Sequence, residues 1–273
     1  MAVSGVAERP VGAEAGAGAA PGRAALSVAI VTRDEAARVI PCLESAAWAD
    51  EIVVVDSGSS DGTQELCRAR GAVVLERPWG GYAAQKNLAL GEARHPWVLS
   101  LDADERVTEE LKAQILQVLA ADGPCDGYRM PRKNIFFGKW LRRGDFWPDH
   151  QIRLFRKARG RFSDKAVHES VEVEGRVGEL TAPLEHRSYE RLEEYFARQV
   201  RYAALAAEER SGQAGAVRLR DLLLRPAGRF AKGYVLKGGW RDGIEGFIAA
   251  AGGAFYVFMR TAFLWERRRG TRG

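Results

Sequence analysis

Three acidic residues at the end of an apolar run are the first candidates for chemistry in this sequence. Asp102, Asp104 and Glu105 directly follow the run Trp97–Leu101. Carboxylates at positions i and i+2 can bind a divalent cation, directly or through water, because Mg²⁺ prefers hard oxygen ligands. Mg²⁺ also shares its coordination shell with substrate phosphates. A ligand that carries phosphate would therefore complete a site built on two aspartates.

This stretch has two other possible interpretations. A calcium-binding EF-hand loop needs an oxygen ligand at its fifth position and glycine at its sixth, where this sequence has Arg106 and Val107. A solvated turn that caps the next helix, with Thr108 as N-cap, remains an alternative, because two aspartates separated by one residue are a weak signal alone.

The acidic residues belong to a pattern of alternating strands and helices. Short apolar runs predict four buried strands, with helical segments between them: Leu26–Val31, Ile52–Val55, Ala72–Glu76 and Trp97–Leu101. This alternation predicts right-handed βαβ units and a mostly parallel sheet covered on both faces. Ligands of such sheets bind beyond the carboxyl ends of the strands. The polar clusters Thr32–Glu35, Asp56–Asp61 and Asp102–Glu105 should therefore line one crevice.

An ordered set of motifs carries a family resemblance. VTRDEA, VVVDSGSSDGT, AAQKNLAL and LSLDADE occur in that order. The set resembles the inverting, nucleotide-sugar-dependent glycosyltransferases of the family 2 type. Further along, WPDHQIRLFRK, VHESVEV, LEHRSY and the C-terminal tail resemble the lipopolysaccharide core glucosyltransferase branch of that family. The resemblance extends from residue 26 to about residue 267.

The resemblance implies the fold and its division. We expect an α/β protein with the GT-A fold, a Rossmann-like, mostly parallel central sheet flanked by helices, followed by a C-terminal helical membrane-associating extension. Residues 1–25 are rich in alanine and glycine and are expected to form a disordered tail rather than a signal peptide. Residues 26–190 would form the nucleotide-sugar-binding and catalytic domain. Residues 191–273 would form the helical, membrane-proximal region.

The resemblance also implies a donor site for a UDP-sugar with Mg²⁺ or Mn²⁺. The backbone at Thr32 and the side chains of Glu35 and Asp56 would hold the uridine, and Lys86 would lie near the base and diphosphate. Asp102 would face the ribose or the metal, and Asp104 would bind the metal. His168 is a candidate third metal ligand. Simpler alternatives are that Asp56 braces its own loop, that Lys86 is solvated and that His168 is structural.

The catalytic base should come from the second half of the chain. Inverting transfer is a single displacement in which a base takes the proton of the acceptor hydroxyl. The candidates are Asp149, Asp164 and Glu169, and Asp149 is favoured, followed by Glu169. The chain has QIRLF where processive relatives have Q-x-x-R-W, which favours the addition of a single sugar.

Charge is distributed unevenly along the chain. From Arg218 onward there are twelve basic and four acidic residues, whereas the whole chain has a net charge of only +5. Aromatic and apolar residues lie between these basic residues, a pattern typical of helices at an anionic membrane surface. An ordinary packed helical subdomain and, less favoured, a nucleic-acid-binding tail are the alternatives. No run of about 18 residues is both apolar and free of charge, so a simple transmembrane helix is not expected.

These observations combine into one functional hypothesis. The chain is expected to move one hexose, glucose from UDP-glucose, onto a lipopolysaccharide inner-core or other lipid-linked acceptor. It would act in the cytoplasm, peripherally bound to the inner face of the cytoplasmic membrane. The three cysteines, Cys42, Cys67 and Cys125, form no C-x-x-C pair and suit a reducing compartment. The alternative is a non-catalytic nucleotide-sugar-binding or membrane-scaffolding protein on the same fold.

Overall fold

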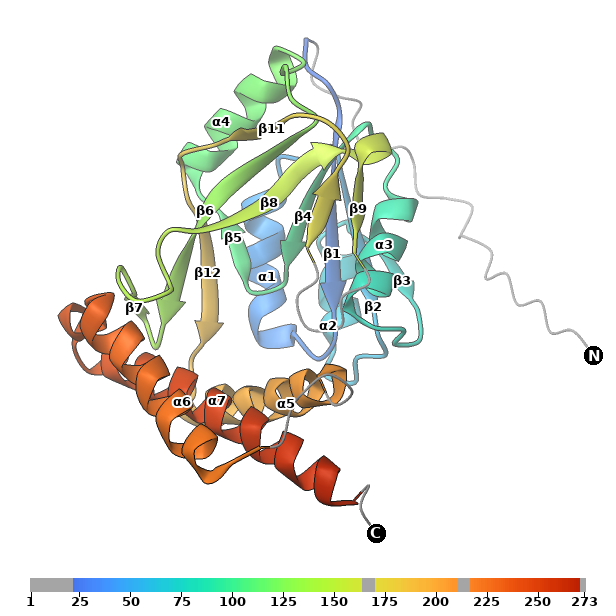
Figure 1. Cartoon of the computed structure of the whole chain (residues 1–273). Coiled ribbons are helices and arrows are strands. Elements are labelled where there is room, and N and C mark those ends of the chain that lie inside the picture. Colours follow the sequence, from blue (N-terminus) through green and yellow to red (C-terminus); the bar gives the residue numbers. More distant parts are fainter. Residues whose placement is uncertain (1–21, 164–169, 211–216, 271–273) are drawn as a thin grey trace, which may run out of the picture.

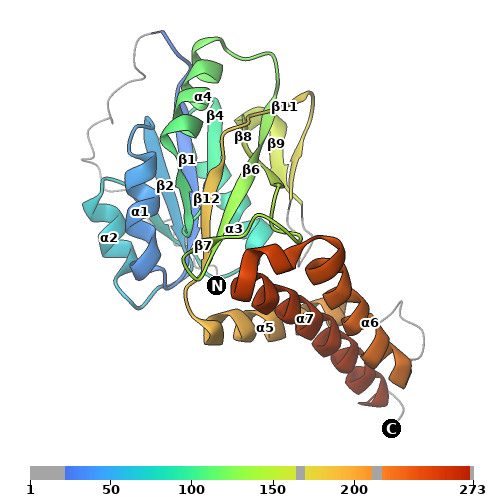
Figure 2. The same ribbon diagram turned by 90° about the vertical axis from the view of Figure 1, so that its left-hand side faces the viewer.

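The computed structural model describes residues 22–163, 170–210 and 217–270. A curled sheet with helices on both faces occupies one part of the molecule, and a layer of helices lies at one end of it (Figure 1). Figure 2 shows α1 (Ala36–Ala46) and α4 (Glu109–Ala120) on one side of the sheet. The remaining helices are α2 (Thr63–Ala69), α3 (Tyr82–Glu92), α5 (Leu192–Glu209), α6 (Leu219–Ala231) and α7 (Gly243–Gly270).

Ten strands form the main sheet, in the order β3-β2-β1-β4-β8-β6-β12-β5, with β7 and β11 also paired to β6. The first group of strands is β1 (Leu26–Thr32), β2 (Glu51–Asp56), β3 (Val73–Glu76), β4 (Trp97–Asp102) and β5 (Glu105–Val107). The second group is β6 (Gly127–Phe136), β7 (Lys139–Trp140), β8 (Asp149–Arg156), β11 (Val177–Glu179) and β12 (Leu184–Tyr189). A separate hairpin consists of β9 (Gly160–Phe162) and β10 (Val171–Val173).

The first half of the sheet is the parallel βαβ arrangement that the sequence predicts. β1 pairs in parallel with both β2 and β4, and β2 pairs in parallel with β3. Along β1, Leu26, Val28 and Ile30 pack into the core cluster that includes residues of α1 and α4, whereas Ala29 packs into the cluster on the α3 face. This alternation follows from the two-residue period of a strand and buries both faces of β1.

The basic and aromatic segment that follows α4 contains a long central strand. Residues 127–136 form a single ten-residue strand, β6, that pairs with β8 and β12 on its two sides. From its sequence the segment looks too basic for a central strand. It can form one because acidic residues of neighbouring elements neutralise its arginines. Arg129 pairs with Glu179 at 2.7 Å, and Arg132 pairs with Asp149 at 2.7 Å.

The C-terminal helices form a layer below the sheet, where β12 leads into α5 (Figure 1). Phe136, Leu141, Tyr195 and Ala249 form a buried cluster that joins this layer to the sheet. α6 and α7 are linked by two short helical turns, η2 (Lys232–Leu236) and η3 (Gly239–Asp242).

One helix in the described residues is long and apolar enough to cross a membrane, by length and composition only. It runs from Gly239 to Arg269, and only 28% of its most apolar part is buried against the rest of the molecule. The sequence-based criterion of a charge-free stretch did not find it, because Arg260 lies within the apolar run.

Candidate active site

A cavity of about 660 Å³ lies at the carboxyl ends of β1 and β4. A volume of this size is typical of sites for small-molecule ligands, which occupy about 300–1,000 Å³. The structure brings together in this cavity five of the residues selected from the sequence: Thr32, Glu35, Lys86, Asp102 and Asp104. They come from the ends of β1 and β4 and from α3, so the parallel sheet is what places them side by side.

Asp102 is held by two cations of the protein. Lys86 Nζ lies 2.9 Å from one of its carboxylate oxygens, and Arg153 Nη2 lies 2.7 Å from the other. Burial raises the pKa of Asp102, but Arg153 and Lys86 outweigh burial and hold the pKa well below 3.8. Asp102 is therefore an ionised carboxylate, and Lys86 is anchored at the cavity wall rather than solvated.

Asp104 lies opposite a histidine that the sequence analysis did not select. Nε2 of His186, on β12, is 3.4 Å from Asp104 Oδ2, and both side chains are nearly buried. Burial raises the pKa of Asp104, but His186 lowers it below 3.8. The backbone supports the pairing, because the Arg187 amide donates a hydrogen bond to the Asp104 carbonyl at 2.9 Å.

The hydrogen bonds of Asn134 determine which nitrogen of His186 carries the proton. The Asn134 amide nitrogen donates to the Phe146 carbonyl at 2.9 Å, so its oxygen accepts from His186 Nδ1 at 2.7 Å. With Nδ1 donating to Asn134, Nε2 is the His186 atom that faces the Asp104 carboxylate: it donates to Asp104 when it carries a proton and can bind a cation when it does not. Two ligand atoms that face each other in this way fit a divalent cation.

The described residues contain no group of three or more His, Cys, Asp or Glu side chains arranged to hold a metal ion. Asp104 and His186, with Asp102 next to them in the cavity wall, are the donor set that the described part of the chain offers. Such a sparse set suits Mg²⁺ or Mn²⁺, which keep several waters or share a diphosphate ligand. The predicted ligand His168 lies outside the described residues.

Asp56 lies behind the cavity and is fully buried. Its carboxylate accepts hydrogen bonds from Thr32 Oγ1 at 2.9 Å, from the Ser59 amide at 2.8 Å and from Gln64 Nε2 at 2.8 Å. Burial raises its pKa, but these hydrogen bonds outweigh burial and lower the pKa below 3.8. Asp56 thus braces the loop after β2 and holds Thr32 at the cavity edge, and its contact with a uridine stays a prediction.

Glu35 lines the cavity between charges of both signs. Burial, reinforced by the negative charge of Asp104, raises the pKa of Glu35 to about 7, although Arg38 opposes the shift. Near neutral pH this side chain can therefore be present with its proton, as a hydrogen-bond donor as well as an acceptor.

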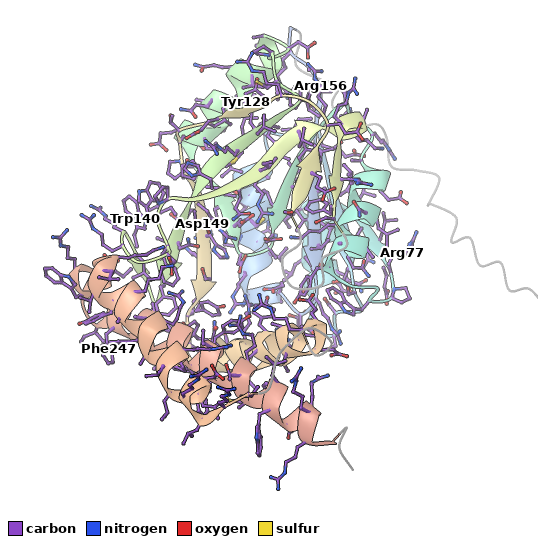
Figure 3. All side chains as sticks on the ribbon, viewed as in Figure 1. Arg77, Tyr128, Trp140, Asp149, Arg156 and Phe247 are labelled. Carbon is purple, nitrogen blue, oxygen red and sulfur yellow. The ribbon has the colours of Figure 1, made fainter. Side chains whose placement is uncertain are left out.

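Asp149, the favoured base, is the first residue of β8 (Figure 3). Arg132 donates two hydrogen bonds to it, at 2.7 and 2.9 Å, and Gln151 donates another at 2.8 Å. Burial raises the pKa of Asp149, but Arg132 outweighs burial and lowers it. Arg132 lines the cavity, whereas Asp149 does not. The alternatives Glu169 and Asp164 lie outside the described residues.

The sequence analysis also missed one wall of the cavity. Four residues of α5 line it: Arg198, Arg201, Tyr202 and Leu205. Their spacing of i, i+3, i+4 and i+7 places them on one face of the helix. The segment RQVRYAAL shows this spacing in the sequence, but nothing in the sequence indicates that this face turns toward the sheet rather than toward a membrane.

Comparison with known proteins identifies the family. A family model described as glycosyl transferase family 2 matches residues 27–171. The chain belongs to glycosyltransferase family 2. It is therefore a glycosyltransferase, as predicted, and the alternative of a non-catalytic protein is not supported.

Two relatives extend the comparison along most of the chain. The lipopolysaccharide core biosynthesis glycosyltransferase LpsC of Rhizobium meliloti is 33% identical over 249 residues, which cover 89% of this chain and 92% of LpsC. The uncharacterized glycosyltransferase RT0209 of Rickettsia typhi is 28% identical over 257 residues, covering 88% of this chain and 87% of that protein. The predicted resemblance to the lipopolysaccharide core branch is thus confirmed.

The fold is confirmed by a solved glycosyltransferase. The mannosyltransferase PcManGT from Pyrobaculum calidifontis, solved in complex with GDP-Man and Mn²⁺, aligns with a TM-score of 0.55. The alignment covers 90% of this chain and 88% of PcManGT, at 17% identity. The α/β GT-A architecture predicted from the motifs is therefore present in this family 2 member.

Proposed function

We propose that this glycosyltransferase moves a single hexose, glucose from UDP-glucose, with inversion onto a lipopolysaccharide inner-core heptose or another lipid-linked acceptor. The observation that carries the proposal is the single cavity lined by Thr32, Glu35, Lys86, Asp102 and Asp104. A base and ribose offer donors that carboxylates accept, and a diphosphate needs positive charge. The name of the relative LpsC supports an acceptor in the lipopolysaccharide core.

Asp104 and His186 would hold Mg²⁺ or Mn²⁺ in this proposal, with the ionised Asp102 next to them. When bound, the cation would neutralise charge that develops on the departing nucleoside diphosphate. Lys86 adds a positive charge at the same wall, where its ammonium group lies 2.9 Å from Asp102. The GDP-Man and Mn²⁺ named for PcManGT support a nucleotide-sugar donor and a metal.

The base is the acid in the second half of the chain that takes the proton of the acceptor hydroxyl. Asp149 is a weak candidate in this geometry, because its ion pair with Arg132 lowers its pKa and its basicity. We therefore place Glu169 first and Asp149 second. Replacing the true base by its amide, Glu169→Gln or Asp149→Asn, should abolish transfer while leaving UDP binding unchanged. A variant that transfers at the normal rate removes that residue from consideration.

The C-terminal layer would bind the cytoplasmic face of the membrane peripherally. No residue of α6 is buried, and the exposed fraction of its Leu219 is 73% and of Leu224 is 68%. Phe247 points outward from α7 (Figure 3), and its exposed fraction is 48%. Basic side chains lie among these apolar ones, which complements an anionic bilayer: Arg218, Arg220, Arg225, Lys232 and Lys237.

A screen of sugar nucleotides tests the proposal most directly. Purified protein is incubated with UDP-glucose and other donors, with Mg²⁺, Mn²⁺ or EDTA, and with a core oligosaccharide acceptor. We expect metal-dependent transfer from UDP-glucose that disappears in Asp104→Ala. Turnover with another donor only would overturn the glucose assignment. Transfer that is unaffected by EDTA would overturn the metal assignment.

A further inference from the structure

The cavity wall formed by α5 carries positive charge that the donor chemistry does not use. Among the described residues, Arg33 and Arg201 line the cavity without forming an ion pair to any carboxylate. Arg198 lines the same cavity, and its guanidinium is 5.1 Å from the centre of the Tyr189 ring. Burial lowers the pKa of Arg198, but Asp104 and Glu35 are close enough to help raise it. These three arginines, two on α5 and Arg33 in the loop after β1, line the same cavity, and we call them the α5 arginine cluster.

The other cations of the cavity are already neutralised. Lys86 and Arg153 both contact Asp102, at 2.9 and 2.7 Å. Arg132 contacts Asp149 at 2.7 Å and Glu105 at 3.5 Å. The surplus of positive charge in the cavity is therefore concentrated at the α5 arginine cluster. Arg33 and Arg201 are exposed to solvent and Arg198 is half-buried, so an anion that enters the cavity can reach them and is attracted by their charge.

The proposed donor already has groups that match its diphosphate. Lys86 and the cation held by Asp104 and His186 would lie at the β4 wall. The α5 arginines also lie outside residues 27–171, the segment that the family model matches. Arg198 and Arg201, unlike Arg33, therefore belong to a part of the chain that the family model does not cover, and recognition of this protein's own acceptor is to be sought there.

We propose that Arg198, Arg201 and Arg33 form a second anion-binding subsite that holds a phosphate or carboxylate group of the acceptor. The guanidinium fork suits both groups, because it donates paired hydrogen bonds to two oxygens. Tyr202 and Tyr189 line the same wall and provide aromatic surface for the sugar that carries the anion. This inference rests on the proposed function and narrows its acceptor class to acidic saccharides.

A first experiment tests the subsite without an acceptor. Inorganic phosphate is titrated by calorimetry into protein saturated with UDP and Mg²⁺. We expect phosphate to bind while UDP remains bound, and Arg201→Gln or Arg198→Gln to weaken it about tenfold. Arg210→Gln removes the same charge from the exposed end of α5, away from the cavity, and should leave phosphate affinity unchanged.

Three results of these binding measurements would overturn the inference. Phosphate that binds only when UDP is absent would assign the arginines to the diphosphate of the donor. Weaker UDP binding in Arg201→Gln, with phosphate affinity unchanged, would do the same. Equal phosphate affinity in Arg201→Gln and Arg210→Gln would show that general surface charge, rather than a subsite, binds the anion.

A second experiment identifies the source of the anion. Transfer is measured to the native core oligosaccharide, to its dephosphorylated form and to its carboxyl-reduced form. Removal of the recognised group should lower kcat/KM about tenfold in the wild type and have little further effect in Arg201→Gln, since coupled changes are not additive. Additive losses would overturn the inference. If no acceptor is glycosylated but phosphate binds beside UDP, the proposed function fails and the subsite stands.

Discussion

Replacing Gly252 by alanine should loosen the contact between α7 and α5, which forms a wall of the cavity. A β-carbon at position 252 would lie 2.0 Å from Tyr195 Oη, 2.3 Å from Cε1 and 2.4 Å from Cζ. Ordinary contacts begin at 3.4 Å, so the ring or the helix must move by more than an ångström. Glycine is therefore required at this crossing of the two helices.

The Tyr195 ring has little freedom to move aside. Only 3% of it is exposed, and its hydroxyl donates a hydrogen bond to the Ala249 carbonyl at 3.3 Å. Phe136 packs against it at right angles with ring centres 5.0 Å apart, and the Tyr189 ring lies 4.8 Å away on the cavity side. The new methyl group must therefore push α5 away from α7 rather than rotate one side chain.

The expected loss of stability is the difference between two opposing effects. Alanine is favoured over glycine in a helix by about 1 kcal/mol, whereas overpacking a buried site costs about 1–3 kcal/mol. Three atoms of a constrained ring lie within the forbidden distance, so the cost should be at the upper end. We expect Gly252→Ala to lower the free energy of unfolding by about 2 kcal/mol, or Tm by about 4–8 °C.

Gly253 provides a matched control on the same helix. A β-carbon there would lie 3.4 Å from Arg229 Nη2, an ordinary contact. Gly253→Ala should therefore be neutral or stabilise the protein by up to about 1 kcal/mol. Both variants are compared by thermal and urea denaturation followed by circular dichroism. If Gly252→Ala is as stable as Gly253→Ala, Tyr195 does not pack against α7 as described, and this reasoning is refuted.

Three further predictions address the metal, a buried acid and the membrane. His186→Asn should weaken the Mn²⁺ affinity by about 10–100-fold, as measured by titrating UDP-glucose hydrolysis with Mn²⁺. An unchanged Mn²⁺ affinity would exclude His186 as a ligand. Asp56→Asn should lose about 2–3 kcal/mol of stability at pH 7, because a buried carboxylate loses several hydrogen bonds. The folded-state pKa of Asp56 lies below 3.8, so the stabilisation by its ionised carboxylate is present above pH 3.8 and is lost as the pH falls through the folded-state pKa. Urea denaturation should therefore show that the stabilities of the wild type and Asp56→Asn converge in acid. Leu223→Glu with Leu224→Glu should abolish co-sedimentation with anionic vesicles, and binding equal to that of the wild type would contradict the proposed membrane surface.

The parallel half of the fold could be predicted because its signals are local. Each strand from β1 to β4 is a short apolar run followed by polar residues, and Thr108 caps α4 by accepting a hydrogen bond from the Leu111 amide at 3.2 Å. β6 could not be predicted in this way. Its arginines resemble those of a surface loop until Asp149 and Glu179 are brought beside them by strand pairing.

In the candidate site, too, some residues could be predicted from local sequence and others could not. Asp102 and Asp104 follow a strand in the sequence, and the rule that parallel strands end at one edge places them beside Thr32 and Glu35. His186 lies more than eighty residues after Asp104, and no periodicity connects the two. Their proximity arises because β12 pairs antiparallel with β5, which places His186 opposite Glu105 in the register.

By itself, the sequence determined the alternation of strands and helices, the cluster of acids at the strand ends and the family 2 resemblance. Each of these is carried by short segments whose apolar spacing and residue types act locally. Only the tertiary structure decided that α5 closes the cavity with Arg198 and Arg201 and that His186 faces Asp104. The physical reason is that a helix or strand shows in its sequence which residues share a face, whereas the partner of that face is selected by packing between segments far apart in the chain.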